Sequence, residues 1–447
     1  MCGIAGFCNF NENFEENTDY WNFRLEKMRA VLAHRGNDAR GRFLKKHIGL
    51  SHSRLAIRDI LCGDQPMTRT HNGYDYTICY NGEIYNTDEL IPELSENGFV
   101  CSTTSDTEVI LYAYIHWGAD FVSRLNGIFA FAIWDAAKNR LLLYRDRVGV
   151  KPLFFAIRGD SLVFGSEPKA CFAHPAVKPE LDKQGLQELL AIGPAHTSGL
   201  SLFKDLCEGL PGHFMIYSKD GLHDETYWEL TSREHTDSYQ DTVAHTRFLV
   251  EDAIKRQMVS DVPVCTFLSG GIDSSIVTAI AANYMNTRGK TLNTFSFDFK
   301  DNDKYFKANA FQPERDLPYV NRMLEEYETA HSYLECDENS LFKALFAAVD
   351  AKDMPGMTDV DSSLLYFCSL VSRKNKVALT GECADEIFGG YPWFYRKELL
   401  ERYGFPWSSD VAPRLALLRN DVALELDLSD YQAFRYEESR SKAPLLY

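Results

Sequence analysis

The segment from residue 262 to residue 285 constrains the fold of this chain more than any other part of the sequence. Val262 to Leu268 is an apolar run rich in β-forming residues, and a Ser-Gly-Gly turn follows it. From Ile272 to Met285 apolar residues recur at i, i+4 and i+8, which is the spacing of a helix. Strand, glycine turn and helix in direct succession are typical of a parallel sheet in an α/β domain. Further strands of that sheet are expected at 291–299 and 376–380.

The N-terminal half has a different pattern, with short apolar runs separated by turn signals such as Asn81-Gly82 and Gly159-Asp160. This pattern predicts mainly β structure, with helices near 21–32 and 105–117. At 447 residues the chain is too long for one ordinary core. We therefore expect an N-terminal domain at 1–218, a polar linker at 219–241, and an α/β domain at 242–447 that opens with a helix at 242–258.

Composition excludes several classes of protein. The net charge of −17 disfavours nucleic acid as a partner, because phosphate binding requires a basic face. No apolar run approaches the roughly 18 residues of a membrane span, and the start of the chain lacks the pattern of a secretory signal. The 11 cysteines show no CxxC pair and no zinc-like spacing. We therefore expect a cytoplasmic protein whose cysteines, apart from Cys2, are mostly buried thiols.

Cys2 is a candidate nucleophile because it becomes the first residue if Met1 is removed. A terminal cysteine carries its own base, since a free α-amine titrates near about 7.7 to 8.0. The amine takes the thiol proton directly or through water, and no separate histidine is needed. The alternative is that Cys2 is an incidental second residue with no role in chemistry.

The sequence around Cys2 and downstream of it resembles the class II glutamine amidotransferases. The matching segments are Met1 to Gly6, His34 to Asp38, Ser53 to Ile57, Asn81 to Asn86 and Ser105 to Glu108. They recur in the family's order and, with the strands after them, cover nearly the whole N-terminal half. The resemblance implies a four-layer αββα Ntn-hydrolase domain. One departure is Asn37, where the family usually has proline.

The same resemblance implies a role for individual residues. Arg54 would pair with the α-carboxylate of glutamine, a contact that suits a guanidinium fork, within a glutamine-binding set Arg54, Leu55, Ala56, Ile57 and Arg58. Asp106, and with less weight Glu83, would receive the α-ammonium group. The Asn81 side chain and the Gly82 backbone N–H would form an oxyanion hole beside Cys2. Taken alone, Asn81-Gly82 after a strand is equally a plain hairpin turn.

A second candidate site lies at the turn between the strand and the helix of segment 262–285. Two glycines let the backbone approach a polyphosphate, and the helix N-terminus offers N–H donors. The chain contains no GxxxxGK[ST] sequence, so this is not a γ-phosphate-transferring P-loop. The full string resembles the loop of the N-type ATP pyrophosphatases, which cleave ATP to AMP and pyrophosphate. The resemblance assigns ATP to Ser269, Gly270, Gly271, Asp273 and Ser274, with Phe267, Leu268 and Phe297 on the adenine side.

An acidic cluster follows the expected strand at 376–380. Acids at a helix start are often only a solvated, electrostatically favoured set. Here the cluster resembles the asparagine synthetase motif Ser-Gly-Glu-Gly-Ser-Asp-Glu, with Thr380, Cys383 and Ala384 in place of Ser, Gly and Ser. The resemblance implies that Thr380 and Gly381 contact the nucleotide and that Glu382 acts near an aspartyl-adenylate. It also implies that Asp273 and Asp385 bind Mg²⁺, which favours carboxylates together with phosphate oxygens and water.

These resemblances together predict an α/β and α+β protein of the glutamine-hydrolysing asparagine synthetase family. The expected substrates are glutamine, ATP with Mg²⁺, and aspartate or a related carboxylate. Two alternatives stay open: an amidotransferase that acts on another carboxylate, and a glutaminase or sensor with a defective synthetase half. The residues after Tyr391 contain no segment of the Glu-Val-Arg-x-Pro-Phe type. We therefore expect strong glutaminase and weak synthetase activity unless a partner chain completes the site, with a homo-oligomer as an open alternative.

Overall fold

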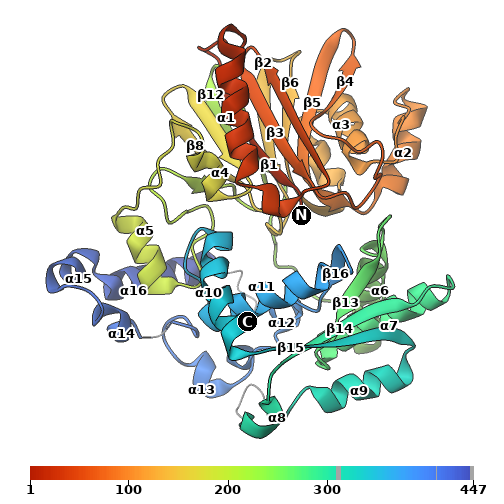
Figure 1. Ribbon diagram of the computed structural model, residues 1–447, viewed down its shortest axis with the longest axis vertical. Helices are drawn as coiled ribbons and strands as arrows, with labels where there is room; N and C mark the ends of the chain where they lie inside the picture. Colours follow the sequence, from red (N-terminus) through yellow and green to blue (C-terminus); the bar gives the residue numbers. More distant parts are fainter. Residues whose placement is uncertain (309–313, 409, 443–447) are drawn as a thin grey trace. The chain divides into compact units, whose positions relative to one another are not determined.

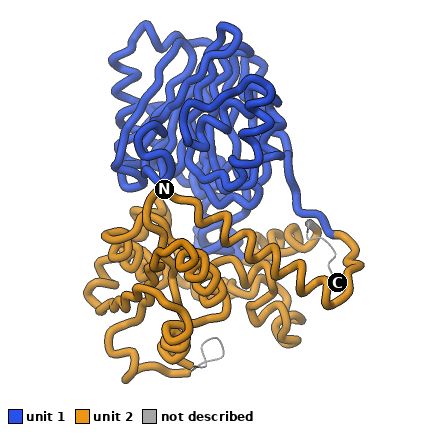
Figure 2. Tube along the Cα trace, turned by 90° about the vertical axis from the view of Figure 1, so that its right-hand side faces the viewer, with its two compact units in different colours: residues 1–232, 419–428, 444–447 blue, residues 233–418, 429–443 orange. Residues whose placement is uncertain are grey.

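The computed structural model describes residues 1–308, 314–408 and 410–442. The chain divides into two compact units, which Figure 2 shows in two colours. The described part of unit 1 comprises residues 1–232 and 419–428. The described part of unit 2 comprises residues 233–418 and 429–442, apart from the gaps stated above. The domain boundaries expected from the sequence stay a prediction.

Unit 1 contains two six-stranded antiparallel sheets (Figure 1). The first sheet has the order β10 (Cys207–Glu208), β8 (Phe154–Arg158), β9 (Ser161–Gly165), β1 (Gly3–Asn9), β3 (Ile48–Arg54) and β2 (Ala39–Lys45). The second has the order β12 (Gly221–Thr226), β11 (His213–Ser218), β7 (Arg140–Arg145), β6 (Gly127–Asp135), β5 (Tyr74–Ile84) and β4 (Met67–His71). The apolar runs of the N-terminal half that predict strands, at 76–80, 128–134, 141–144 and 162–164, lie in β5, β6, β7 and β9.

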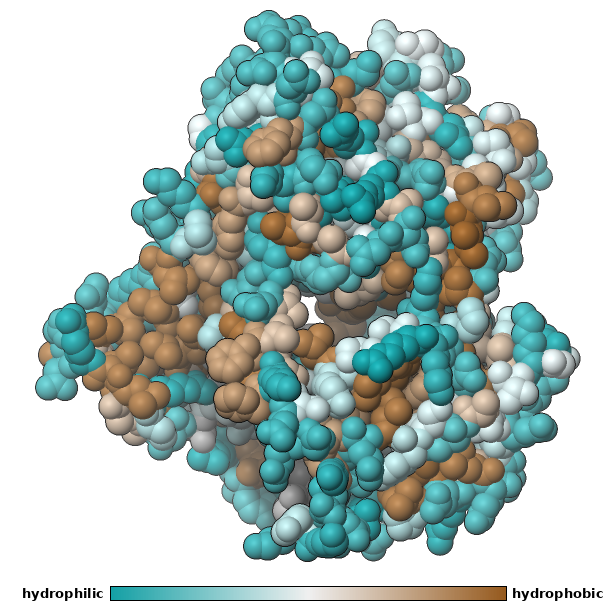
Figure 3. All heavy atoms as spheres, in the orientation of Figure 1, coloured by the Kyte–Doolittle hydropathy of each residue, from teal (hydrophilic) through white to brown (hydrophobic). Residues whose placement is uncertain are grey.

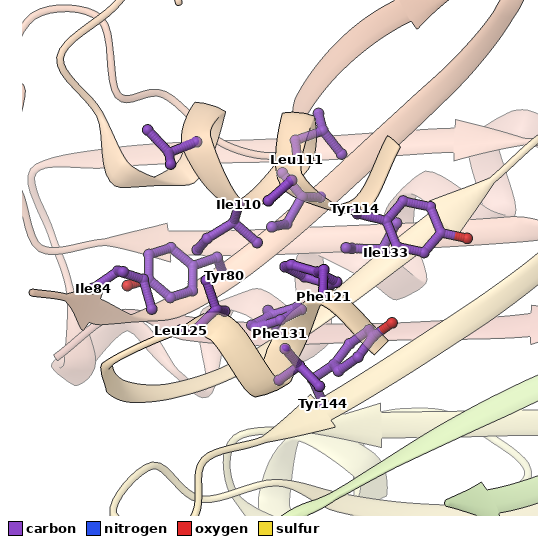
Figure 4. Close-up of a cluster of buried hydrophobic side chains, with 14 of the residues drawn as sticks. Tyr80, Ile84, Ile110, Leu111, Tyr114, Phe121, Leu125, Phe131, Ile133 and Tyr144 are labelled. Carbon is purple, nitrogen blue, oxygen red and sulfur yellow. The ribbon is translucent and has the colours of Figure 1, made fainter. Parts of the chain in front are cut away.

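Three apolar clusters show that the two sheets are stacked between helices. One cluster joins the facing sides of the sheets, with Leu50 of the first packed in the same core as Leu143 of the second. A second lies under α1 (Thr18–Ala30) and α4 (Pro168–Phe172), on the other side of the first sheet. The third lies under α2 (Thr87–Glu96) and α3 (Asp106–Trp117), on the second sheet (Figure 4). The expected αββα arrangement is confirmed.

Part of the range expected to be a linker is strand. β12 pairs with β11 from Gly221 to Thr226, opposite Ser218 to His213. The last four residues of β12 are exposed. An edge strand that buries little side-chain surface needs no apolar alternation, so its sequence carries none of the usual strand pattern.

Unit 2 contains a four-stranded parallel sheet in the order β15 (Thr329–Cys336), β14 (Leu292–Phe299), β13 (Val264–Phe267) and β16 (Val377–Leu379). Helix α7 (Ile272–Asn286) follows β13 and packs on the sheet through Ala281 and Ala282. α11 (Thr358–Val371) contributes Phe367 to a cluster with Phe295 of β14. The parallel α/β sheet expected from the segment 262–285 is confirmed.

The other elements complete the two units. They are η1 (Phe14–Asn17), η2 (Ala33–Arg35), η3 (Ala119–Arg124), α5 (Lys183–Gln187), η4 (Glu188–Ile192), α6 (Tyr239–Arg256), α8 (Asn302–Tyr305), α9 (Leu317–Glu326), α10 (Glu338–Lys352), α12 (Ala384–Phe388), η5 (Pro392–Phe394), α13 (Lys397–Leu400), α14 (Ala412–Leu415), α15 (Asn420–Leu426) and α16 (Leu428–Lys442). Within the described ranges, no helix combines the length and the apolar character needed to cross a membrane. Unit 2 exposes large apolar side chains such as Phe346 and Ile387, and Figure 3 shows hydrophobic residues at the surface.

Candidate active sites

Cys2 lies directly before β1, against the end of β3. Its sulfur accepts a hydrogen bond from the Leu55 backbone N–H at 3.4 Å, and the thiol lies 3.6 Å from the Leu55 carbonyl oxygen. The two segments meet because β1 and β3 are antiparallel neighbours, with Gly3 opposite Ser53. The fold thus brings the N-terminal cysteine to the segment 54–58, as the sequence predicts for one glutamine site.

A buried ion pair holds the backbone of Cys2. Arg35 donates from Nε to the Cys2 carbonyl oxygen at 2.9 Å and from Nη1 to Glu167 Oε1 at 2.7 Å. His34 Nε2 lies 3.0 Å from the same carboxylate oxygen. Burial raises the pKa of Glu167, but the hydrogen bonds with His34 and Arg35 outweigh it and lower the value to about 2. The Glu167 carboxylate therefore stays ionised at neutral pH, and Arg35, which it pairs with, holds the Cys2 carbonyl oxygen.

The surroundings of Cys2 favour a neutral thiol beside a neutral amine. Burial raises the pKa of the Cys2 thiol, and burial lowers the pKa of the Met1 α-amine from 8.0 to about 5. An amine in this environment is unprotonated at neutral pH and can accept a proton. Lys151, a residue to which the sequence analysis gave no role, is buried in the same region, and burial lowers its pKa.

Asn81 and Gly82 lie on β5, and the amide nitrogen of Asn81 is the most informative atom of the site. Asn81 is buried, and its Nδ2 has no hydrogen-bond partner among the described residues. A buried donor without a partner costs about 1–3 kcal/mol, so it indicates a group that is satisfied by something else. A developing oxyanion is such a partner. Gly82 is required for a separate reason, because a Cβ there would lie 2.3 Å from the Ile128 carbonyl oxygen.

Asp106 and Glu83 form an acidic pair next to these donors. Asp106 Oδ2 accepts hydrogen bonds from the Tyr80 hydroxyl at 2.8 Å and from the Ile84 N–H at 3.1 Å. Burial raises the pKa of both carboxyls, and the charge of Asp106 raises that of Glu83 further. Arg58 offsets part of this repulsion. A bound ammonium group would offset the rest, as expected for the α-ammonium of an amino acid.

The remaining residues of the segment 54–58 have different surroundings. The Arg54 guanidinium is buried and donates to three backbone carbonyls and to the carboxylate of Asp64. The Ala56 N–H donates to Asp38 Oδ2 at 2.8 Å. Arg58 donates to the Ile84 carbonyl oxygen at 2.8 Å, and Ile57 is half-buried. Within this segment, Leu55 contacts Cys2 and Arg58 contacts the end of β5.

Glu108, quoted in a motif but given no role by the sequence analysis, fixes the turn that carries Asp106. Its fully buried carboxylate accepts hydrogen bonds from Arg69 Nε at 2.8 Å and from the backbone N–H groups of Ser102 and Thr103 at 2.9 and 2.7 Å. Two hydroxyls also donate to it. Burial raises its pKa, but these hydrogen bonds lower it to about 2.

We expect the Glu108→Gln variant to unfold at a lower denaturant concentration than wild type. Its free energy of unfolding should fall by about 1–3 kcal/mol at pH 7, because the NH₂ group of the glutamine amide would face the N–H donors that bind the carboxylate. The folded pKa of about 2 lies below the ordinary value of 4.5. The stabilisation is therefore present above pH 4.5 and is lost as the pH falls toward 2. Urea unfolding measured from pH 7 downward should show that the difference in free energy of unfolding between the variant and wild type becomes smaller below pH 4.5.

The control is Glu93→Gln, which breaks the partly exposed ion pair with Arg124. It should lower the free energy of unfolding by less than about 1 kcal/mol. Equal unfolding of wild type and Glu108→Gln at pH 7 would contradict the assignment.

In unit 2 the turn after β13 is held by its own serines. Ser274 Oγ accepts a hydrogen bond from the Ser269 N–H at 3.2 Å and donates to the Gly271 carbonyl oxygen at 3.2 Å. Gly270 has φ of +84°, and a Cβ there would lie 2.8 Å from the Tyr319 Cβ. Gly271, the N-cap of α7, is exposed, and a Cβ there would make only an ordinary contact, 3.5 Å from Ser269 Oγ. The turn therefore presents the N-terminus of a 15-residue helix to solvent, as the predicted polyphosphate site would require.

The acidic cluster reaches this turn through a close backbone contact. A Cβ at Gly381 would lie 2.7 Å from both the Asp273 Cβ and the Ser274 nitrogen, so only glycine fits. Burial raises the pKa of Asp273, and the nearby charge of Asp385 raises it further. The structure thus brings the two predicted metal ligands together as a pair. Among the described residues, no group of three or more His, Cys, Asp or Glu side chains could hold a metal ion.

A pocket next to the turn contains three of the residues predicted for the adenine side and the loop. Leu268, Ser269 and Phe297 line it. Its other polar residues, which include Ser296, Asp298 and Tyr333, belong to no motif in the sequence and were not predicted. The rings of Phe267 and Phe297 pack on Phe367 with centroids 4.5 and 5.1 Å away. Thr380 is half-buried and Glu382 is exposed.

Comparison with known proteins assigns the same two halves. Residues 1–228 match the family model of the glutamine amidotransferase domain, and residues 245–446 match that of asparagine synthase. The chain is 47% identical over 447 residues to asparagine synthetase [glutamine-hydrolyzing] 3 of Bacillus subtilis, covering 100% of this chain and 72% of the relative.

Two further relatives agree. Asparagine synthetase [glutamine-hydrolyzing] 1 of B. subtilis is 33% identical, over 89% of this chain and 60% of that protein. A putative asparagine synthetase [glutamine-hydrolyzing] 2 of Methanocaldococcus jannaschii is 31% identical, over 88% of this chain and 76% of that protein. This chain belongs to the family of the glutamine-hydrolysing asparagine synthetases.

Proposed function

We propose that this chain is a glutamine-hydrolysing asparagine synthetase, an ATP-dependent ligase. It converts glutamine, aspartate, ATP and water to glutamate, asparagine, AMP and pyrophosphate. The observation that carries the proposal is the 47% identity, over the whole chain, to an asparagine synthetase. The unpartnered Asn81 amide in the region of Cys2 supports the glutaminase half, and the pairing of Asp273 with Asp385 supports the synthetase half.

The glutaminase reaction follows from the residues around Cys2. Removal of Met1 gives Cys2 a free α-amine, which takes the thiol proton directly or through water. The thiolate attacks the glutamine side-chain amide, while Asn81 Nδ2 and the Gly82 N–H donate to the carbonyl oxygen as it becomes an oxyanion. Losing one such donor typically costs ~2.7–4 kcal/mol of transition-state stabilisation. Ammonia leaves, and water hydrolyses the glutamyl thioester.

The substrate's polar groups are held by the neighbouring charges. Arg54 pairs with the α-carboxylate, and Asp106 with Glu83 receives the α-ammonium. Without substrate, burial raises the pKa of both carboxyls, and the charge of Asp106 raises the pKa of Glu83 further. The bound ammonium group offsets this repulsion. Arg35 and Glu167 hold the Cys2 backbone during attack, because their ion pair survives at all ordinary pH values.

The synthetase reaction uses the turn after β13 and the acidic cluster. The aspartate carboxylate attacks the α-phosphorus of ATP, and pyrophosphate leaves. The N–H groups at the start of α7 and the Ser269 and Ser274 hydroxyls donate to phosphate oxygens, and Leu268 and Phe297 contact the adenine side. Thr380 and Gly381 contact the nucleotide, and Glu382 acts beside the aspartyl-adenylate. Ammonia then displaces AMP and forms asparagine.

Asp273 and Asp385 fit a magnesium ion. Two adjacent carboxylates whose charges repel are a suitable donor set, since Mg²⁺ is usually held by one or two carboxylates with phosphate oxygens and water. When bound, Mg²⁺ would neutralise charge on the departing pyrophosphate.

The relatives do not favour the two alternatives from the sequence. The relatives at 47% and 33% identity are both named asparagine synthetases.

The test is to incubate the protein with glutamine, ATP, Mg²⁺ and a panel of carboxylic acids. We expect glutamate, AMP and asparagine to form together, with aspartate as the preferred acid. ADP in place of AMP would contradict the pyrophosphatase chemistry, and an amide of another acid would replace the assigned acceptor.

A further inference from the structure

The Arg54 guanidinium already has partners in the positions that a substrate carboxylate would need. Nη1 donates to the Ile60 carbonyl oxygen at 3.2 Å and to Asp64 Oδ1 at 3.0 Å. Nη2 donates to the carbonyl oxygens of Arg58 at 3.3 Å and Asp59 at 2.5 Å. A guanidinium has five N–H groups, and both Nη atoms carry two each. Each of the four Nη N–H groups therefore has an oxygen partner.

A bidentate contact to a carboxylate uses two parallel N–H groups, and at least one of them is on an Nη atom. A substrate carboxylate must therefore displace one of the four oxygens. The carbonyls belong to a turn that Asp59 fixes, through Oδ1 to the Cys62 N–H and Oδ2 to the Thr104 N–H, both at 2.8 Å. Asp64 is different, because its side chain is 76% exposed. Of the four oxygens bound to the Nη atoms, the Asp64 carboxylate oxygen is therefore displaced into solvent at the lowest free-energy cost.

The backbone of Asp64 is nevertheless fixed on both sides. Gly63 approaches Arg54 so closely that a Cβ would lie 2.3 Å from Nη2. Gln65 accepts a hydrogen bond from the Tyr80 N–H at 2.6 Å and donates to Thr107. The Asp64 carboxylate thus stays next to Arg54 although its side chain faces solvent. It has the same charge and the same two-oxygen geometry as an amino-acid α-carboxylate.

We infer that Asp64 is an internal competitor for the α-carboxylate of glutamine at Arg54. Glutamine binding exchanges one carboxylate for another, and Asp64 is released to solvent as the substrate enters. Asp64 thereby sets the affinity for glutamine without taking part in the chemistry. The inference rests on the proposed function in one respect, namely that Arg54 receives the substrate carboxylate.

The experiment measures glutamine binding separately from turnover. In the Cys2→Ala protein, calorimetry gives the Kd for glutamine with and without Asp64→Asn. We expect Kd to fall about two- to fivefold, the size expected for loss of an exposed ion pair. In the protein with Cys2 intact, KM for glutamine should fall by the same factor while kcat stays unchanged. Asp64→Glu keeps the carboxylate and should keep the parental Kd.

Two controls isolate the competition. Glutamine α-methyl ester lacks the negative charge, so its Kd should not fall in Asp64→Asn. Glu93→Gln removes a partly exposed acid that pairs with Arg124 at 3.0 Å on the same unit, and it should leave Kd for glutamine unchanged.

An unchanged or raised Kd for glutamine in Asp64→Asn would overturn the inference, as would an equal fall for the ester or a fall in kcat. Absence of glutamate release from the Cys2 protein, with glutamine binding retained, would instead count against the proposed function. Absence of glutamine binding in every variant would overturn both.

Discussion

The Cys2→Ala variant is expected to lose glutamine-dependent glutamate release by roughly 10⁴- to 10⁶-fold, as enzymes do when they lose a nucleophile or its base. The thiol is the group that forms the acyl intermediate, and no other cysteine is brought to the segment 54–58 in the described hydrogen bonds. Synthesis from added ammonia should continue, because the synthetase motifs lie in unit 2. Measuring glutamate, AMP and asparagine in the same sample distinguishes a loss of glutaminase activity from a loss of synthetase activity.

Cys8→Ala is the matched control for this variant. Cys8 lies on β1, the strand that begins directly after Cys2, but its thiol is buried in the apolar cluster between the sheets. Its loss should leave glutaminase activity near the parental rate. A non-removable N-terminal extension should mimic Cys2→Ala, since it converts the α-amine to an amide. Full glutaminase activity in a protein whose extension is verified by mass spectrometry would disprove the terminal-amine mechanism.

Asp273→Asn and Asp385→Asn are each expected to lower AMP formation by about 10²-fold or more. A metal ion typically contributes several kcal/mol of charge stabilisation, and 1.4 kcal/mol is a factor of about ten. Asparagine keeps the size of each side chain but removes the charge that attracts the ion. Glutamate release should stay at the parental rate, since neither residue belongs to unit 1. Pyrophosphate release and AMP formation measured at several Mg²⁺ concentrations test this.

A partial rescue of either variant by high Mg²⁺ is expected, because a weakened site fills at higher concentration. Asp359→Asn provides the control, as an exposed acid in the first turn of α11. It should leave the rate and its Mg²⁺ dependence unchanged. AMP formation at the parental rate in Asp273→Asn or in Asp385→Asn would remove that residue from the proposed metal site.

Local patterns in the sequence were sufficient to predict the mainly β structure of unit 1 and the parallel sheet of unit 2, whereas the αββα arrangement was implied by the family resemblance. The apolar runs of the N-terminal half became β5, β6, β7 and β9, and the strand–turn–helix segment became β13 and α7. These predictions succeeded because apolar runs between turn signals and helically spaced apolar residues indicate which residues of an element are buried. β12 was missed because an exposed edge strand has no buried face to produce the pattern.

The sequence by itself also identified Cys2, Asn81, Asp273 and Asp385 as candidates, because their motifs are local strings of residues. Only the tertiary structure decided what these residues contact. The unpartnered amide of Asn81, the carboxylate of Asp64 at Arg54 and the proximity of Asp273 to Asp385 depend on contacts between separate segments of the chain. The burial of Glu108 and of Lys151 is likewise visible only in the folded structure. The physical reason is that a motif specifies the chemistry of a side chain, whereas its partners and its pKa depend on the distances and the desolvation that folding creates.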